Sequence, residues 1–473
     1  MTLPLSEVVC VDFGSTFTKA ALVDLTDGTI VAAAAHRTTI DTDVLDGYDA
    51  CLAALVGQDA RATRAPVLAC SSAGGGLRIA VVGNEELVTA EAGRRVALSS
   101  GGKVVAVIGV ASRPPEEGPW TREVRTSEPD VVLLTGGTDG GNAEVLLRAA
   151  RELVGSGWTG PVVVAGNIDA RDEVAAVLAA GGVPHVLADN VVPRIGVLAP
   201  DSARAAIREM FLAHVIGGKH LSSRADFTAM VRGATPDVVL TGVELLARGT
   251  DGLPGAGDVV VVDVGGATTD VHSVVEPDPD NALTEDGLAR EVVATTPVTR
   301  TVEGDLGMRW SAATTVAAAH AARVDVADGL DEAAAARTAD PDLLPADDAA
   351  ADQDEAIAAL ASGLALRRHA GRARVVLSTA DDPGGAGRVI ERSGKDLREV
   401  DLLLASGGIF RNGRPGVEQR VLAGLVGEVE GGWQLPRAAR VVVDRDYVLA
   451  AAGLLAAAHP EAAYRLTRRL VDG

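Results

Sequence analysis

Two aspartate–glycine turns, far apart in the sequence, contain the side chains best suited to chemistry. The first spans residues 8–19 and reads VVCVDFGSTFTK, and the second spans residues 259–270 and reads VVVVDVGGATTD. In each, an apolar run ends in a carboxylate, Asp12 or Asp263, turns at glycine and returns through hydroxyl residues. Two such copies predict two similar half-domains that face each other across a cleft, with one phosphate loop on each side.

Phosphate and magnesium binding explain these residue types. Glycine adopts positive φ and lets the backbone approach a ligand closely, and turn amides and hydroxyls can donate to phosphate oxygens. Carboxylates suit Mg²⁺, which keeps part of its water shell and bridges to substrate phosphates. The residues expected to contact phosphate are Gly14, Ser15 and Thr16 in the first turn and Gly265, Gly266, Thr268 and Thr269 in the second.

Other readings of the turns are available. The chain has no GxxxxGKS/T sequence of P-loop proteins, and neither turn matches the dinucleotide fingerprint. Either turn alone is equally well explained as an ordinary hairpin with a glycine bend. The repetition of the aspartate at the same place in both turns favours the phosphate-loop interpretation.

The elements around the turns predict an α/β protein. Strand and helix alternate between residues 131 and 187, which indicates parallel βαβ units. Strands are expected at 8–12, 18–25, 29–35, 66–70, 103–110, 131–134, 162–165, 185–187, 238–241, 402–405 and 441–443, and helices at 44–56, 85–99, 203–216, 360–374 and 447–458. We expect three domains: an N-terminal lobe at 1–115, an inserted parallel α/β module at 116–200 and a C-terminal lobe at 201–473.

Composition narrows the classes of function. Apolar residues make up 47% of the 473 residues and aromatic residues only 3%, so the cores must consist of Val, Leu and Ala. A formal charge of −22 argues against nucleic acid or an anionic membrane as a partner. The three cysteines have no metal-binding spacing, and the N-terminus lacks signal-peptide regions. We therefore expect a cytoplasmic protein.

A third glycine turn, at residues 406–413, follows the apolar run at 402–405. Its pair Gly407 and Gly408 would let the backbone pass flat against an adenine or a ribose. Taken in order, the three turns resemble those of the superfamily of actin, sugar kinases, acetate kinase and heat-shock chaperones. The resemblance implies a duplicated, two-lobed ribonuclease-H-like fold with an ATP–Mg²⁺ cleft.

A more specific resemblance is to the MutL-type accessory family of adenosylcobalamin-dependent mutases such as glutamate mutase. It is carried by residues 12–19, 133–142, 263–270, 301–309 and 368–371, and so extends over nearly the whole chain. The resemblance implies a chaperone-like protein that assists or reactivates a mutase. The cobalamin would belong to that partner, because the chain has no DxHxxG motif.

The resemblance also implies roles for single residues. Asp12 and Asp263 would hold Mg²⁺ through its waters, and one of them would position the attacking water. Lys19 would contact phosphate, with a solvent-facing strand position as the alternative. Auxiliary roles as metal ligand or base fall to Asp270, Glu303 and Asp305, with a structural carboxylate near the cleft or a capped turn as the alternative.

Three functions fit these patterns. The first is an ATPase that remodels a mutase. The second is a small-molecule kinase acting on a sugar or a carboxylate. The third is a structural protein that binds nucleotide without significant turnover.

Overall fold

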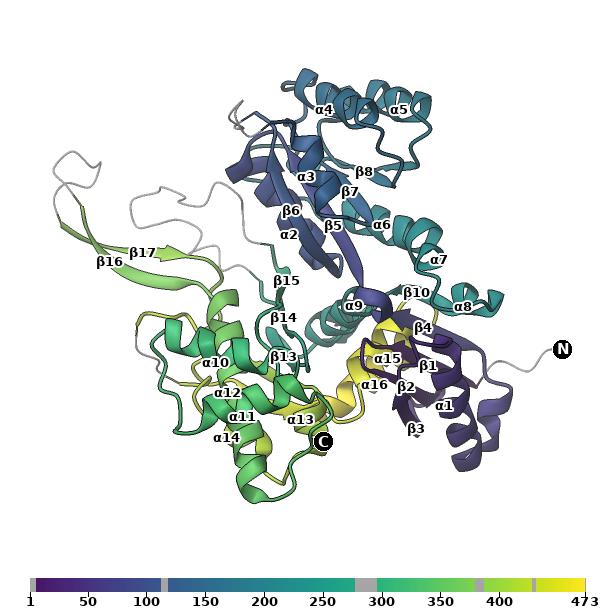
Figure 1. The fold of residues 1–473 in the computed structure, drawn as a ribbon, viewed down its shortest axis with the longest axis vertical. Coiled ribbons are helices and arrows are strands. Elements are labelled where there is room, and N and C mark those ends of the chain that lie inside the picture. Colours follow the sequence, from purple (N-terminus) through teal and green to yellow (C-terminus); the bar gives the residue numbers. More distant parts are fainter. Residues whose placement is uncertain (1–5, 112–117, 277–295, 379–386, 428–430, 473) are drawn as a thin grey trace. The chain divides into compact units, whose positions relative to one another are not determined.

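The computed structural model describes residues 6–111, 118–276, 296–378, 387–427 and 431–472 (Figure 1). The chain divides into two compact units. One contains residues 1–241, 291–296 and 453–462, and the other contains residues 242–290, 297–452 and 463–473. The domain boundary predicted at 115/116 lies outside the described residues.

Within the described residues, the strands form three five-stranded sheets and two two-stranded sheets. The first sheet has the order β10-β4-β1-β2-β3, with β1 Glu7–Phe13, β2 Phe17–Asp24, β3 Thr29–Arg37, β4 Val67–Ser71 and β10 Val231–Ala234. The second has the order β15-β14-β13-β18-β19, with β13 Val259–Val264, β14 Thr269–Val274, β15 Val298–Glu303, β18 Leu402–Ser406 and β19 Arg440–Val443. The third has the order β6-β5-β7-β8-β9, with β5 Leu77–Gly83, β6 Gly102–Gly109, β7 Val131–Leu134, β8 Val162–Val164 and β9 His185–Leu187.

The smaller sheets pair β11 Gly249–Thr250 with β12 Leu253–Pro254, and β16 Arg372–Ser378 with β17 Gly387–Ser393. The β16–β17 hairpin extends away from helices α10–α12 of its own unit (Figure 1). The helices of the first unit are α1 Val44–Gln58, α2 Glu91–Ser99, α3 Trp120–Thr126, α4 Glu144–Gly155, α5 Arg171–Ala180, α6 Asp201–Met210, α7 Ile216–Gly218 and α8 Ala225–Met230. The helices that come after these in the chain are α9 Thr235–Arg248, α10 Ala312–Ala321, α11 Leu330–Ala339, α12 Asp348–His369, α13 Gly408–Asn412, α14 Val417–Leu422, α15 Val448–Leu455 and α16 Pro460–Asp472.

The first and second sheets are built in the same way. In the first, β1, β2 and β3 are antiparallel neighbours, β1 is parallel to β4, and β4 is parallel to β10. In the second, β13, β14 and β15 repeat the antiparallel set, and β18 and β19 repeat the parallel pair. The duplicated ribonuclease-H-like α/β fold is therefore confirmed. The third sheet is all parallel, as expected for an α/β module, but its strands β5 and β6 lie within the range 1–115 that was predicted for the N-terminal lobe.

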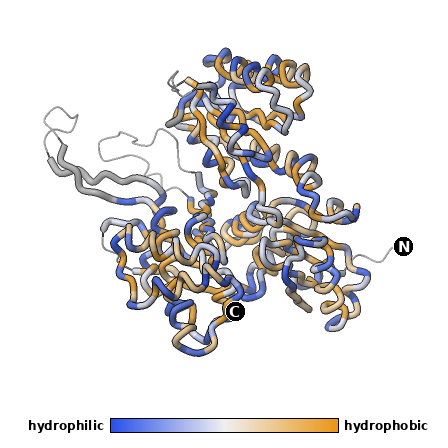
Figure 2. The backbone as a smooth tube through the Cα atoms, in the orientation of Figure 1, coloured by the Kyte–Doolittle hydropathy of each residue, from blue (hydrophilic) through white to orange (hydrophobic). Residues whose placement is uncertain are grey.

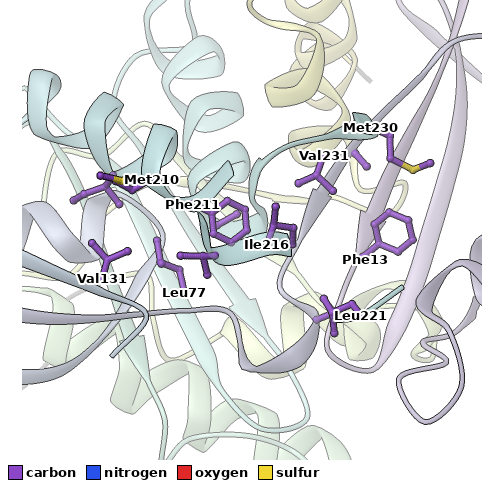
Figure 3. Close-up of a cluster of buried hydrophobic side chains, with 14 of the residues drawn as sticks. Phe13, Leu77, Val131, Met210, Phe211, Ile216, Leu221, Met230 and Val231 are labelled. Carbon is purple, nitrogen blue, oxygen red and sulfur yellow. The ribbon is translucent and has the colours of Figure 1, made fainter. Parts of the chain in front are cut away.

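Apolar burial in the first unit links two sheets into one core. The core runs from Phe13 and Met230 beside the first sheet, through Phe211, to Leu77 and Val131 of the third sheet (Figure 3). In Figure 2, α4 and α5 alternate between hydrophilic and hydrophobic residues, as expected for helices with one buried face. The three cysteines, Cys10, Cys51 and Cys70, are all buried and reduced.

A separate core fills the second unit. Helix α12 packs across β13 and β14, and the buried residues of this core include Val260 and Val262 of β13 and Leu364 of α12. No helix within the described residues is long and apolar enough to cross a membrane.

The structure differs from the sequence prediction in several elements. Residues 238–241, predicted as a strand, lie within α9, because Leu240, Val243 and Leu246 recur at helical spacing and are all buried. The helix predicted at 360–374 ends at His369, and Gly371 precedes a strand. Strands β5, β10, β16 and β17 and helices α10 and α16 were not predicted.

Candidate functional site

The carboxyl ends of β1, β4 and β10 lie at one edge of the first sheet and place polar groups around Asp12. These strands are parallel, so their last residues share an edge. Asp12 is only 8% exposed. Its Oδ1 accepts a 2.7 Å hydrogen bond from the hydroxyl of Thr235, the first residue of α9. Its Oδ2 lies 3.4 Å from the Nζ of Lys19. Lys19, predicted to contact phosphate or to face solvent, therefore lies beside Asp12 within a single hairpin.

The thiol of Cys70 is a third neighbour of Asp12. Its Sγ lies 3.6 Å from Asp12 Oδ1, because Asp12 and Cys70 are register partners on β1 and β4. Burial raises the pKa of the Cys70 thiol well above its ordinary value, and the Asp12 charge raises it further. Cys70 therefore remains a neutral thiol that donates to the carboxylate.

The first turn leaves successive backbone amides available, while several of its carbonyl oxygens accept hydrogen bonds. The Gly14 amide donates to the Phe17 carbonyl at 3.1 Å, and a Cβ on Gly14 would lie 2.6 Å from that oxygen. Thr38 donates to two carbonyl oxygens of the turn: its hydroxyl donates to the Gly14 carbonyl and its amide donates to the Thr16 carbonyl. Within the described chain, the amides of Ser15 and Thr16 donate no hydrogen bond.

The second turn repeats this arrangement with different residues. Gly265 donates to the Thr268 carbonyl at 2.9 Å. The segment after β15 contacts the turn through its backbone. The amides of Met308 and Arg309 donate to the carbonyls of Gly265 and Gly266 at 3.0 and 2.8 Å.

The hydroxyl of Ser311 completes this support, because it donates to the Ala267 carbonyl at 2.6 Å. No described residue accepts from the amides of Gly266, Ala267 or Thr268. Thr269 differs from these three residues, because it is the first residue of β14 and is fully buried. The carbonyl oxygens of residues 265–268 are all occupied in the second turn, and those of Gly14, Thr16 and Phe17 are occupied in the first. In both turns, successive amides are available to an anion.

The partner across the hairpin differs between the two halves. Asp12 faces Lys19 in register, whereas Asp263 faces Asp270. Arg300, which is buried, holds Asp270 Oδ1 at 2.9 Å from its Nε and 2.5 Å from its Nη2. The structure therefore assigns Asp270 a structural ion pair beside the second turn.

Asp444, which lies near Asp263, was not predicted as a site residue from the sequence. It follows β19 directly, is 3% exposed, and accepts the Val448 and Leu449 amides at 2.8 and 3.1 Å. Burial raises the pKa of Asp444 to about 6, and the charge of Asp263 adds to this effect. No local signal reveals it, because Asp444 lies three residues before the N-cap position of α15.

The third glycine turn lies beside the second in the same unit. Ser406 is the register partner of Asp263, and Gly407 follows it with φ +118°. A Cβ on Gly407 would lie 2.3 Å from the Val264 carbonyl, so only glycine fits there. Gly408 is exposed, with no heavy atom within 4 Å of an added Cβ. The structure thus brings Asp263, Gly265, Gly407 and Gly408 to one edge of the second sheet.

Glu303 and Asp305 form an ion-pair cluster with Arg368. The Nη1 of Arg368 lies 2.7 Å from Glu303 and 2.6 Å from Asp305. Burial raises the pKa of Glu303 although Arg368 opposes the shift, and the hydrogen bonds from Arg368 lower the pKa of Asp305. The motifs at 301–309 and 368–371 therefore meet through this cluster.

His369 is a core histidine. Its Nε2 lies 2.8 Å from the Ser273 hydroxyl and its Nδ1 lies 3.0 Å from the Thr301 hydroxyl. Burial lowers its pKa well below the ordinary value, so the ring is neutral. It contributes no charge to an anion site.

The glycine-rich loop at 135–142, in the third sheet, is held by buried asparagines. Asn190 donates to the Gly137 carbonyl at 2.9 Å and to Asp139 at 2.8 Å, and Asn167 donates to the Gly141 carbonyl at 3.2 Å. These contacts favour a tight strand-to-helix turn. Across the described residues, no group of three or more His, Cys, Asp or Glu side chains is placed to hold a metal ion.

The family model of the MutL protein matches residues 8–471 of this chain. The chain is also 34% identical over 469 residues to Protein MutL of Clostridium tetanomorphum, a match that covers 97% of both chains. The chain therefore belongs to the MutL protein family.

Solved structures give weaker matches. The ethanolamine utilization protein EutJ from Carboxydothermus hydrogenoformans is 11% identical, with 98% of this chain and 92% of that chain covered and a TM-score of 0.28. The activator of 2-hydroxyisocaproyl-CoA dehydratase from Clostridium difficile, with bound ADPNP, is 11% identical, with 96% and 95% covered and a TM-score of 0.30. At these TM-scores, neither structure supports a statement about this chain.

Proposed function

We propose that this member of the MutL family is an ATP–Mg²⁺-binding accessory protein that hydrolyses ATP to remodel or reactivate an adenosylcobalamin-dependent mutase. The observation that carries the nucleotide part is the repeated glycine turn, in which the amides of Ser15, Thr16, Gly266, Ala267 and Thr268 are available. Oriented amides of this kind bind phosphate oxygens.

The remaining contacts follow from the same arrangement. Asp12 and Asp263 are the candidate ligands of Mg²⁺ through its waters, since a hard cation prefers carboxylate and water oxygens. Lys19 supplies positive charge beside the first turn. Gly408, which is exposed and directly follows the buried Gly407, offers bare backbone for an adenosine. The membership of the MutL family supports the mutase as partner, and the glutamate mutase or aminomutase type is the class we propose.

Phosphate release from ATP by the purified full chain tests the proposal. We expect Mg²⁺-dependent release with no added acceptor, and an increase when a mutase inactivated during turnover is added. The Asp12→Asn and Asp263→Asn variants should lose release while their thermal unfolding stays close to that of the wild type. Unchanged release in both variants would show that the assigned turns do not hold the nucleotide.

The same assay separates the other two functions. Transfer of labelled phosphate to a sugar or a carboxylate, in preference to water, would replace the accessory function with a kinase. Nucleotide binding with no release and no effect of a mutase would leave a structural role.

A further inference from the structure

The carboxylate of Asp12 has a hydrogen-bond donor on each oxygen. Thr235 reaches Oδ1 at 2.7 Å, and Lys19 reaches Oδ2 at 3.4 Å. Cys70 lies further away, with its Sγ 3.6 Å from Oδ1. The contact with Thr235 is the shortest of the three, and it fixes the rotation of the carboxylate.

Thr235 is itself held in place from two directions. It follows β10, which is paired to β4 in the first sheet, and it begins α9. Two residues further on, Asp237 is 1% exposed and accepts a 2.6 Å hydrogen bond from the Nε of Arg208. An aspartate in the first helical turn also stabilises the helix start. The hydroxyl of Thr235 therefore comes from a rigid position.

The equivalent position in the second sheet has different chemistry. The residue directly after β19 is Asp444, a carboxylate whose oxygens accept from the start of α15. A carboxylate in that place has no proton to offer Asp263 when ionised. The Thr235 hydroxyl therefore has no counterpart at this position of the second sheet.

We infer that Thr235 is a positioning residue that holds the ionised Asp12 in the orientation needed to bind the water shell of Mg²⁺. This inference rests on the proposed function. A hydrogen bond to a charged group stabilises it more than a neutral one does, so loss of the hydroxyl should weaken Mg²⁺ binding before it weakens the fold.

The Thr235→Val variant keeps the shape of the side chain and removes the hydroxyl, and Thr235→Ser keeps the hydroxyl. In Mg²⁺ titrations at a fixed ATP-analogue concentration, followed by calorimetry, Thr235→Val should need about tenfold more Mg²⁺ than the wild type. Thr235→Ser should stay within about twofold. Thr228→Val, on the exposed side of α8, is the matched control and should titrate as the wild type does.

The outcomes separate this inference from the proposed function. If the wild type binds no Mg²⁺–nucleotide, the proposed function fails. If the wild type binds and Thr235→Val has the same Mg²⁺ requirement, the positioning role is wrong. A Thr235→Ser variant as weak as Thr235→Val would also contradict it, because the hydroxyl would then not be the group that matters.

Discussion

Lys19 lies directly across the β1–β2 ladder from Asp12, with its Nζ 3.4 Å from the carboxylate. The equivalent residue across the β13–β14 ladder from Asp263 is Asp270, which is tied to Arg300. One scaffold therefore carries opposite charges at the same place in its two copies. Across the ladder from its aspartate, the first turn has a cation, whereas the second turn has a carboxylate that is paired with Arg300. Because of this difference, mutations can test the two turns separately.

Replacement of Lys19 by Met should weaken nucleotide binding about tenfold, because one charge-assisted contact to phosphate is lost. The cost to folding should stay below about 1 kcal/mol, since the Lys19–Asp12 pair is partly exposed to solvent. Calorimetric titration with an ATP analogue and a thermal melt measure the two effects. Lys103→Met, an exposed strand position, is the control. Equal affinity in the wild type and Lys19→Met would place Lys19 outside the site.

Alanine at Gly14 or Gly265 should disable its turn. An added Cβ would lie 2.6 Å from the Phe17 carbonyl or 2.8 Å from the Thr268 carbonyl, so the backbone must shift. We expect loss of nucleotide binding at a folding cost of about 1–3 kcal/mol.

Gly57→Ala is the matched control for these variants, because nothing lies within 4 Å of its added Cβ in α1. It should leave binding unchanged and raise the free energy of unfolding by up to about 1 kcal/mol. Full binding by Gly14→Ala and Gly265→Ala would contradict the close approach seen in both turns.

The buried Asp354 cluster should be sensitive to loss of one partner. Arg337 and Arg309 reach the two oxygens of Asp354 at 2.5 and 2.8 Å, and Asp354 is 3% exposed. Arg337→Met should lower the free energy of unfolding by about 3 kcal/mol, as measured by urea denaturation. Arg468→Met breaks the surface pair with Asp472 and should cost less than about 0.5 kcal/mol. If both variants lost the same free energy of unfolding, burial would not be the reason for the sensitivity of the Asp354 cluster.

Stability should fall in acid through His272. Burial lowers the pKa of His272 to about 3, and Arg300 contributes further. Because the unfolded chain takes up this proton near pH 6.5, the stability from the neutral ring is complete above about pH 6.5. It should decline by about 1.4 kcal/mol for each pH unit below that, down to the folded pKa.

Urea denaturation of the wild type and His272→Gln between pH 7 and pH 5 tests this effect. The difference between the two should shrink as the pH falls, because only the wild type loses the contribution of the neutral ring. His36→Gln, at an exposed position, should keep a constant difference from the wild type. A constant difference for His272→Gln as well would mean that the ring is not neutral in the folded protein.

The sequence predicts the duplicated hairpins well because their signals are local. An apolar run, an aspartate and a glycine turn fix both the strand pair and the position of Asp12 or Asp263. Short buried strands such as 131–134 and 402–405 are equally clear, since each is a continuous apolar run bounded by turn residues. The residues of the three glycine turns were predicted in the same way.

Residues that act through long-range contacts could not be predicted. Thr235 is 223 positions from Asp12 in sequence, and only the pairing of β10 with β4 brings the two together. The prediction of a strand at 238–241 was wrong for a related reason. Its short β-branched run matches a strand locally, whereas the helical stripe that overrides it extends over the whole of α9.

The burial of all three cysteines makes the chain a ready host for site-directed labelling. Burial raises the pKa of Cys10 to about 12 and of Cys51 to about 11, and it raises that of Cys70 as well, so native thiols should resist alkylation. A fluorophore or a spin label attached to a single cysteine added at the surface would therefore report its own position alone. Distances between such labels could follow the two halves during turnover without removal of any natural cysteine.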